Sequence, residues 1–321
     1  MGMSKVDLSL DFAGVRLKNP VVTVSGTCGF GEEYKPYYKP SELGAISVKG
    51  TTLEPRMGNP PPRIAETPSG ILNSIGLQNP GVDAFVTREL PRLKAEGAVV
   101  MANIAGSTIS DYCAVAEKLA ETNVDFIEMN ISCPNVKEGG VAFGTNPDTV
   151  EKITSEVKRV AKQPLIVKLS PNVTDITATA KAAEAGGADA VSLINTLLGM
   201  RIDIKSRRPI LHNNVGGLSG PAVFPVAVRM VWQVRGAISL PILGMGGIAS
   251  ADDAIEMLIA GADAIGVGTA MFANPYLPLE IIEGIERFLA ENSVGSVKEL
   301  TNTVKPGYCI KRNNKSADNS L

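Results

Sequence analysis

A thiol, two carboxamides and a hydroxyl stand together in the sequence Asn-Ile-Ser-Cys-Pro-Asn at residues 130–135. The apolar run before it, residues 124–129, predicts a buried strand, and the glycine-rich segment 137–144 after it predicts a loop. A strand fixes its neighbours while a loop can open and close, so this position suits chemistry. Cys133 as a thiolate is able to remove a proton from a substrate. The structural alternative is a turn of Ser, Pro and Asn in which Cys133 is a small apolar residue.

Two glycine turns, Gly246-Gly247 and Gly268-Thr269, follow apolar runs further along the chain. Glycines there let backbone N–H groups approach an anion, and a helix starting nearby adds its positive N-terminal end. Residues 244–249 also fit the dinucleotide pattern G-x-G-x-x-A loosely, but Asp263, the nearest acid at the right distance, precedes the next strand. We therefore expect a mononucleotide-like phosphate at these turns. Tight turns that need glycine anyway are the structural alternative.

Composition excludes several classes of protein. The 321 residues are 44% hydrophobic and 20% charged, which suits one large globular domain or two ordinary ones. The formal net charge is −2 and no stretch is strongly basic, which argues against nucleic-acid binding. No run is long enough to span a bilayer and no apolar leader begins the sequence, so we expect a cytoplasmic protein that does not contact a membrane.

The cysteines and the histidine make a metal site improbable. Cys28, Cys113, Cys133 and Cys309 are scattered, without the Cys-x-x-Cys spacing of zinc or iron–sulfur sites. Such spacing suits a reducing cytosol better than a disulfide framework. His212 is the single histidine, which removes every site built from several histidines. We expect no metal in this chain.

Apolar runs alternate with helical patterns through most of the chain. Strands are predicted at residues 21–24, 45–48, 99–104, 124–129, 165–169, 190–194, 242–243 and 264–267, and helices at 107–121, 147–161, 174–185, 251–260 and 277–289, with one more beginning at Gly220-Pro221. Residues 8–17 predict a small hairpin. Long loops fill residues 51–80 and the stretch before Gly220, and loops of such length are usually functional.

Eight strand–helix units predict an α/β fold, namely a (β/α)8 TIM barrel with an N-terminal hairpin and long insertions at the carboxyl-terminal face. A doubly wound sheet is the alternative, since alternation alone does not settle closure. We expect one domain over residues 1–311 and a disordered polar tail at 312–321. Active sites of barrels lie at the carboxyl ends of the strands. The predicted strand ends carry Ser25, Lys49, Asn103, Asn130, Lys168, Asn195 and the two glycine turns.

With these residues assembled, residues 8–273 resemble the class 1 dihydroorotate dehydrogenases, the flavin enzymes of pyrimidine synthesis. The motifs that carry the resemblance are residues 21–31 around Ser-Gly-Thr, the Asn-Ser-Ile-Gly-Leu-Gln-Asn-Pro-Gly sequence at 73–81, the stretch at 130–135 and Gly-Met-Gly-Gly-Ile at 244–248. The ending at residues 77–81 looks most like class 1B, whose catalytic subunit is NAD-linked.

The resemblance implies one FMN per chain and an orotate or dihydroorotate pocket. For FMN it implies Ser25, Lys49, Gly50, Asn103, Asn130, Lys168, Ile194 and Gly220, with the phosphate at Gly246, Gly247, Gly268 and Thr269. For the substrate it implies Lys49, Asn73, Ser74, Ile75, Gly76, Leu77, Asn130, Asn195 and Thr196. Cys133 matches the catalytic base of the family.

The chemistry agrees with these residue types. Oxidising a C5–C6 bond beside a carbonyl needs a base at C5 and a hydride acceptor at C6, which Cys133 and a flavin supply. Carboxamides satisfy ring amides that both donate and accept, and Lys49 offers charge for a carboxylate. Lys168 lies inside an apolar run, where an unpaired lysine is costly to bury, and is a candidate for stabilising the reduced flavin. Each lysine has a solvated surface role as its alternative.

Class 1B also implies a partner, because this chain has no cysteine cluster for electron transfer. Electrons are expected to reach NAD+ through an iron–sulfur flavoprotein subunit carrying FAD and a [2Fe-2S] cluster, in a heterotetramer built on a homodimer of this chain. The alternatives are a class 1A homodimer that reduces fumarate, a dihydropyrimidine dehydrogenase-type barrel acting on uracil, and a flavin-binding module without turnover. Lys49 argues against uracil, which has no carboxylate. Cys28 departs from the larger apolar residue expected there, and we expect inert packing.

Overall fold

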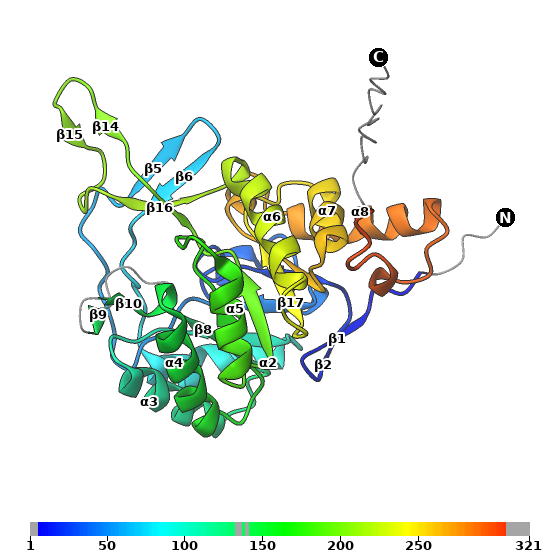
Figure 1. Cartoon of the computed structure of the whole chain (residues 1–321), viewed down its shortest axis with the longest axis horizontal. Coiled ribbons are helices and arrows are strands. Elements are labelled where there is room, and N and C mark those ends of the chain that lie inside the picture. The colour runs from blue at the N-terminus through cyan, green and yellow to red at the C-terminus, as the bar shows by residue number, and fades with distance from the viewer. Residues whose placement is uncertain (1–5, 132–136, 139–140, 306–321) are drawn as a thin grey trace, which may run out of the picture.

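Eight parallel strands close into a barrel in the computed structural model, which describes residues 6–131, 137–138 and 141–305 (Figure 1). The barrel strands are β3 (Val21–Thr23), β4 (Ala45–Ser47), β7 (Val100–Ile104), β8 (Phe126–Asn130), β11 (Leu165–Lys168), β12 (Ala190–Leu193), β17 (Ile242–Met245) and β18 (Ala264–Val267). Each strand pairs in parallel with the next one along the chain, and β18 pairs with β3 to complete the ring. The predicted (β/α)8 barrel is confirmed, and a doubly wound sheet, which has open edges, is excluded.

Helices surround the barrel at most of the predicted places. The helices are α1 (Val82–Ala84), a π-helical turn η3 (Phe85–Glu89), α2 (Leu90–Ala95), α3 (Ile109–Ala120), α4 (Pro147–Val160), α5 (Ile176–Ala185), α6 (Phe224–Arg235), α7 (Ala251–Ala260) and α8 (Leu277–Glu291). Within the described residues, no helix combines the length and the apolarity that crossing a membrane requires.

Two connections differ from the prediction of eight strand–helix units. The helical segment at residues 82–95 was not predicted, and Pro91 in the first turn of α2 explains why its pattern looks broken. Between β3 and β4 the chain forms only two short 3₁₀ helices, η1 (Glu32–Tyr34) and η2 (Pro40–Glu42). Further 3₁₀ turns are η4 (Phe143–Thr145), η5 (Pro221–Val223), η6 (Thr269–Phe272) and η7 (Val297–Glu299).

Side-chain caps explain where four of the helices begin. Thr108 and Asp111 form a capping box at α3, in which each side chain accepts the other's backbone N–H. Asn146, Asp175 and Ser250 each accept an N–H of the first turn of α4, α5 and α7. These caps fix the helices that follow β7, β8, β11 and β17, and so fix the loops leaving those strands.

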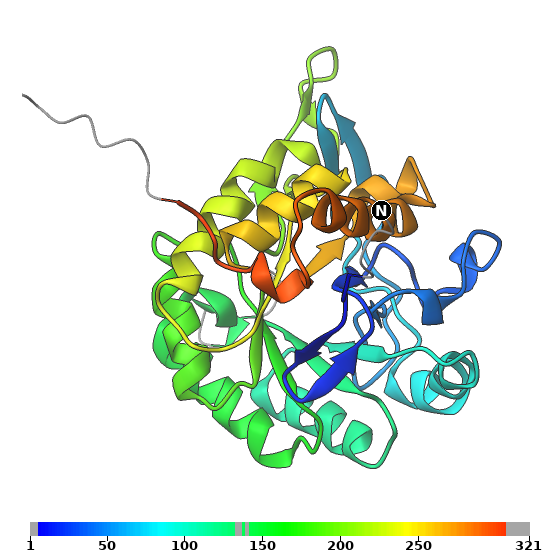
Figure 2. The same cartoon turned by 90° about the vertical axis from the view of Figure 1, so that its right-hand side faces the viewer.

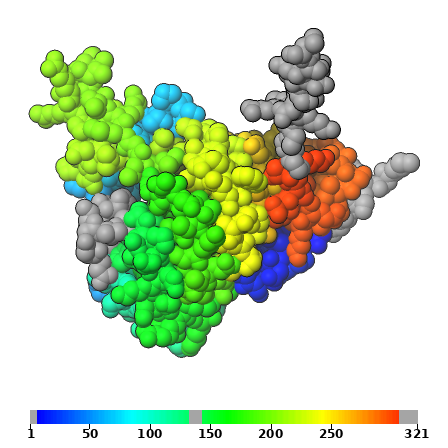
Figure 3. Space-filling view, viewed as in Figure 1, coloured from blue at the N-terminus to red at the C-terminus, as the bar shows by residue number. Residues whose placement is uncertain are grey.

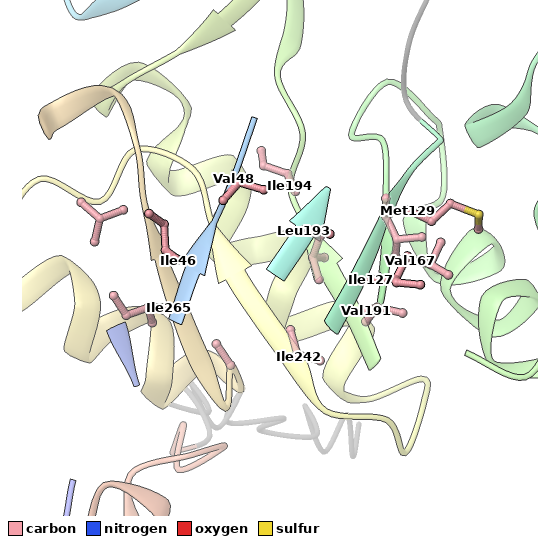
Figure 4. Close-up of a cluster of buried hydrophobic side chains, with 14 of the residues drawn as sticks. Ile46, Val48, Ile127, Met129, Val167, Val191, Leu193, Ile194, Ile242 and Ile265 are labelled. Atoms are coloured by element: carbon pink, nitrogen blue, oxygen red, sulfur yellow. The ribbon is translucent and has the colours of Figure 1, made fainter. Parts of the chain in front are cut away.

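The barrel strands bury both faces. Side chains that point outward, including Ile127, Val167, Val191 and Ile242, pack against the helices in one large cluster (Figure 4). Side chains that point inward near the strands' amino ends form a second cluster that contains Val22, Ala45, Met101, Phe126, Ile166, Ala190, Leu243 and Ala264. Nearly continuous burial along each strand is what a parallel barrel requires.

The N-terminal hairpin closes the amino end of the barrel. Strands β1 (Leu10–Phe12) and β2 (Val15–Leu17) pair antiparallel, as predicted, and Leu10, Phe12 and Leu17 join the inner cluster. Phe12 meets Phe126 of β8 edge to face, with ring centroids 6.0 Å apart. Figure 2 shows this hairpin in blue in front of the barrel strands. The interior is therefore sealed by apolar side chains at this end, which leaves polar chemistry to the other.

The two long loops contain strands that the sequence did not predict. β5 (Ile64–Thr67), β6 (Gly70–Asn73), β13 (Leu197–Gly199) and β16 (Gly216–Ser219) form an antiparallel sheet in the order β13-β16-β6-β5. β14 (Ile202–Asp203) pairs with β15 (Arg208–Pro209), and β9 (Lys137–Glu138) pairs with β10 (Val141–Ala142). The β5–β6 and β14–β15 hairpins project from the body on the side away from the N-terminal hairpin (Figures 1 and 3). They are insertions at the carboxyl-terminal face, as expected.

Candidate active site

The predicted polar residues gather at the carboxyl ends of the barrel strands. Asn130 ends β8 and Lys168 ends β11, while Asn103 lies within β7, one residue before its end. Ser25, Lys49-Gly50, Ile194-Asn195-Thr196, Gly246-Gly247 and Gly268-Thr269 follow β3, β4, β12, β17 and β18. Because the ring is closed and every strand runs the same way, these ends form one rim.

A buried carboxylate lies directly below this rim. Glu128 of β8 is fully buried, and its Oε2 accepts hydrogen bonds from Ser47 Oγ at 3.0 Å and Asn103 Nδ2 at 2.7 Å. Its Oε1 accepts one from Ser192 Oγ at 2.7 Å. Ser47 lies on β4 and Ser192 on β12, each two strands away from β8, so the carboxylate is inside the barrel. Glu128 was not among the residues predicted from the sequence.

Lys168 pairs with this carboxylate. Its Nζ lies 4.0 Å from Glu128 Oε2, and the lysine side chain is 5% exposed. The carboxylate compensates the charge that burial of Lys168 would otherwise leave unpaired. Removing one member of a buried pair leaves an uncompensated charge, which typically costs about 3–5 kcal/mol.

Asn103 presents an unsatisfied acceptor. The residue is fully buried, its Nδ2 is committed to Glu128, and its Oδ1 has no hydrogen-bond partner in the described part of the chain. That oxygen faces Gly50, where an added Cβ would lie 2.8 Å from it. A buried carbonyl oxygen without a donor is rare, so its orientation indicates a ligand N–H or O–H.

Carboxamides form a second group on the rim. Asn195 Nδ2 donates to Asn130 Oδ1 at 2.9 Å, and Asn195 Oδ1 accepts the backbone N–H of Thr196 at 2.8 Å. Asn172, which was not predicted, donates to the carbonyl oxygen of Thr196 at 3.0 Å and accepts from Leu198 N at 2.9 Å. The loop after β12 is thus held by Asn130 of β8 and by Asn172 of the loop after β11, and both Asn172 and Asn195 are half-buried.

The insertion sheet brings residues 73–77 to the same rim. Asn73 ends β6 and pairs with Gly217 of β16, and an added Cβ at Gly217 would overlap Thr196. Ser74, Ile75, Gly76 and Leu77 follow, all half-buried, and an added Cβ at Gly50 would come within 3.7 Å of Leu77. Asn79, buried, hydrogen-bonds with Thr52 in the loop after β4 and fastens the far end of the segment.

Lys49 is a half-buried cation without an anionic partner in the described part of the chain. Its Nζ would lie 3.6 Å from a Cβ added at Gly26, so it reaches over the loop after β3. Burial, and then the positive charge of Arg63, lower the pKa of the Lys49 ammonium below its ordinary value. An anion bound there would relieve both effects.

The glycine turns and the start of α6 make a concave backbone surface. Gly220, Gly246 and Gly247 have φ angles of 104°, 123° and 82°, which favour glycine. A Cβ at Gly247 would lie 2.8 Å from both Phe224 N and Gly220 O, so the turn after β17 lies against the helix entrance. Thr269 Oγ1 donates to Ser219 Oγ at 2.8 Å and joins the loop after β18 to β16.

Of the two cysteines that follow predicted strands, the structure describes Cys28 but not Cys133. Cys133 lies outside the described residues, two positions after Ile131 in the sequence. Cys28 is buried, with its thiol near Thr23 Oγ1 at 3.2 Å and the Ser47 carbonyl oxygen at 3.6 Å. Burial raises the pKa of the Cys28 thiol to about 11, which fits the inert packing expected for it.

Comparison with known proteins identifies the family. The dihydroorotate dehydrogenase family model matches residues 7–289, which is most of the chain. The chain belongs to the dihydroorotate dehydrogenase family. Members named dihydroorotate dehydrogenase B (NAD(+)), catalytic subunit, include a protein of Alkaliphilus metalliredigens, 57% identical over 93% of this chain and 99% of that protein. The protein of Lachnoclostridium phytofermentans is 56% identical over 94% of this chain and 100% of its own length. That of Enterococcus faecalis strain OG1RF is 53% identical over 95% of this chain and 98% of its own length.

The dihydroorotate dehydrogenase fold positions three groups that sequence reasoning missed. Glu128 stands alone among apolar residues at 126–129, so the reasoning that singled out Lys168 applied to it as well. Asn172 follows β11 by four residues and had a detectable signal as a polar residue near a strand end. Arg63 had no detectable signal in the sequence, because only the folding of the insertion sheet brings it near Lys49.

We expect Gly247→Ala to destabilise the protein by about 1 kcal/mol or more, because a positive φ and a backbone clash oppose the new side chain. Gly236→Ala is the matched control. Gly236 has a φ of −74°, and the atom nearest to a Cβ added there, Gln233 O, lies at 3.6 Å, an ordinary van der Waals contact. Chemical denaturation measures both variants. Equal unfolding free energies for the two would contradict the strained turn.

Proposed function

We propose that this chain is the FMN-dependent catalytic subunit of a class 1B dihydroorotate dehydrogenase, which oxidises dihydroorotate to orotate in pyrimidine biosynthesis. The observation that carries the proposal is the 53–57% identity, over more than nine-tenths of the chain, to proteins that bear this name. The rim described above supports it residue by residue. These relatives are named as the B form, which favours class 1B over class 1A.

The residues present fit FMN. The glycine turns at Gly246-Gly247 and Gly268-Thr269, with Gly220 at the entrance of α6, suit a phosphate. Ile194 adjoins Gly246, where an added Cβ would meet its side chain at 3.0 Å. Asn103 offers a buried acceptor and Lys168 a buried cation for the polar edge of the ring, with Ser25, Lys49, Gly50 and Asn130 around it. Bound FMN would supply the hydride acceptor for C6 of dihydroorotate.

Lys49 and the carboxamides suit dihydroorotate rather than an uncharged pyrimidine. The Lys49 ammonium has no anionic partner in the described ranges, which supports its binding the substrate carboxylate, and Arg63 adds positive charge. The side chains of Asn73, Asn130 and Asn195 bind the ring's amide groups, together with Thr196 and the segment from Ser74 to Leu77. Uracil has no carboxylate to engage Lys49, which disfavours a dihydropyrimidine dehydrogenase-type reaction.

Cys133 is the base in this proposal. It stands three residues in sequence after Asn130, which ends β8 at the rim, and we infer the role from that sequence position. As a thiolate it removes the C5 proton of dihydroorotate while the carboxamides hold the ring. A free thiol has a pKa of roughly 8.5, so base strength near neutral pH depends on the site.

A second subunit completes the reaction cycle. The curated relatives are named catalytic subunits, which implies a separate electron-transfer subunit. We propose that an iron–sulfur flavoprotein with FAD and a [2Fe-2S] cluster carries electrons to NAD+, in a heterotetramer built on a homodimer of this chain. We also propose a cytoplasmic location.

The base assignment predicts that Cys133→Ala retains FMN but loses flavin reduction. Anaerobic addition of dihydroorotate should bleach the flavin absorbance of the wild type, at a rate that rises with pH as the thiol ionises. In Cys133→Ala the rate near neutral pH should fall by about 100-fold or more, since a general base contributes that much. Cys113→Ala, a half-buried cysteine on α3, is the control. An unchanged yellow spectrum in the wild type would instead support a passive flavin-binding module. Near-normal flavin reduction in Cys133→Ala would show that Cys133 is not the base.

The carboxylate assignment predicts a pH-dependent affinity for orotate. Orotate binds the protonated Lys49, so affinity should fall as pH rises through the lysine pKa, at a pH below the ordinary value of 10.5. Lys49→Met should bind orotate about 10- to 100-fold more weakly at neutral pH, the loss of one charged hydrogen bond. Isothermal titration calorimetry of both proteins across pH separates the effect of the lysine's ionisation on the affinity from the effect of the ligand's own ring ionisation, because only the wild type has the lysine. The exposed Lys152→Met is the control, and an equal loss of FMN affinity in Lys49→Met would contradict the assignment.

The partner assignment predicts that the purified chain accepts electrons from dihydroorotate but does not pass them to NAD+. Adding a purified iron–sulfur flavoprotein subunit of the B-type enzyme should confer NAD+ reduction, followed by NADH absorbance. Steady turnover of the chain alone with fumarate as acceptor would favour class 1A instead.

A further inference from the structure

The Glu128 carboxylate has no part in the proposed reaction, yet three hydrogen bonds and an ammonium hold it beneath the rim. It receives hydrogen bonds from β4, β7 and β12 and faces the ammonium of β11. A buried charge of this kind is retained only where donors and a counter-charge surround it. Five of the eight barrel strands therefore contribute to holding one carboxylate in place.

The contact with Asn103 has a directional consequence. A carboxamide has one oxygen that accepts and one nitrogen that donates. Glu128 Oε2 accepts only, so at 2.7 Å it must receive the NH₂ group of Asn103. The oxygen of Asn103 is thereby turned away from Glu128, toward Gly50 and the rim, where no described residue donates to it. Without the carboxylate, either end of the amide could face the rim.

We propose that Glu128 is a positioning residue for flavin recognition: it fixes the Asn103 carboxamide so that its oxygen accepts a hydrogen bond from the ring. The proposal rests on FMN as the cofactor of the proposed function. The oxidised flavin ring has several acceptors but a single N–H donor, at N3. A fixed acceptor at Asn103 therefore selects that N–H, and Lys168, held by the same carboxylate, complements the acceptors beside it.

The test compares FMN with its N3-methylated analogue, which lacks the donor. We expect the wild-type apoprotein to bind FMN at least tenfold more tightly than the analogue, measured by quenching of flavin fluorescence. In Glu128→Met the amide loses its fixed orientation, and the preference should fall to about threefold or less, even if both affinities drop. Glu128→Gln retains a carbonyl oxygen that can accept from Asn103 and should keep most of the preference.

Two further variants keep the test decisive. Ser192→Ala removes a hydrogen bond from Oε1 and leaves the Asn103 contact at Oε2, so the preference should persist. If Glu128→Met does not fold, Glu128→Met/Lys168→Met removes both buried charges together and carries the same expectation.

Three results would overturn the role of Glu128: no preference in the wild type, a full preference in both Met variants, or loss of all flavin binding in both. The measurement does not use dihydroorotate. A wild type that binds FMN with the preference but is not reduced by dihydroorotate would refute the proposed reaction and leave the role of Glu128 standing.

Discussion

Burying one carboxylate at the centre of a parallel barrel constrains much of the surrounding structure. Glu128 needs a donor for each oxygen and a counter-charge, because an isolated ion in the interior is far less stable than one in water. Ser47, Asn103 and Ser192 donate, and Lys168 balances the charge. These contacts require β4, β7, β8, β11 and β12 to keep their register, since a shift of one residue turns each side chain to the opposite face.

The two ends of the barrel are consequently different. Phe12 of the N-terminal hairpin and Phe126 of β8 pack together in the apolar cluster that fills the amino end. Above them the inward positions become polar at Glu128 and then reach the half-buried amides and glycine turns of the rim. The insertion sheet adds Asn73 to that rim through its pairing with β16. Polar side chains, backbone concavity and the ammonium of Lys49, which has no anionic partner among the described residues, thus meet at one end.

Local patterns predicted the parts of this architecture that local physics determines. The barrel strands, the hairpin, the capped helices and the glycine turns all leave short-range signals, and α7 and β18 were predicted to the residue. The insertion strands β5, β6, β13 and β16 were read as loops. The pairing that unites them into one sheet, β6 with β16, joins segments more than 100 residues apart along the chain, so no local pattern shows it. Glu128 had the same local signal as Lys168, a charge within an apolar run, but the partners that define its role come from four other strands. Cys133 remains a sequence-based prediction, since it lies outside the described residues.

The account depends on substrate lying between a thiol and a flavin at this rim. A crystal structure of the chain with FMN and orotate tests it most directly. We predict the Cys133 sulfur within about 3.5 Å of C5 of orotate, on the face opposite the flavin, with the phosphate at the glycine turns. A structure with that sulfur remote from the ligand, or with the flavin and the thiol on the same face of the ring, would contradict the account.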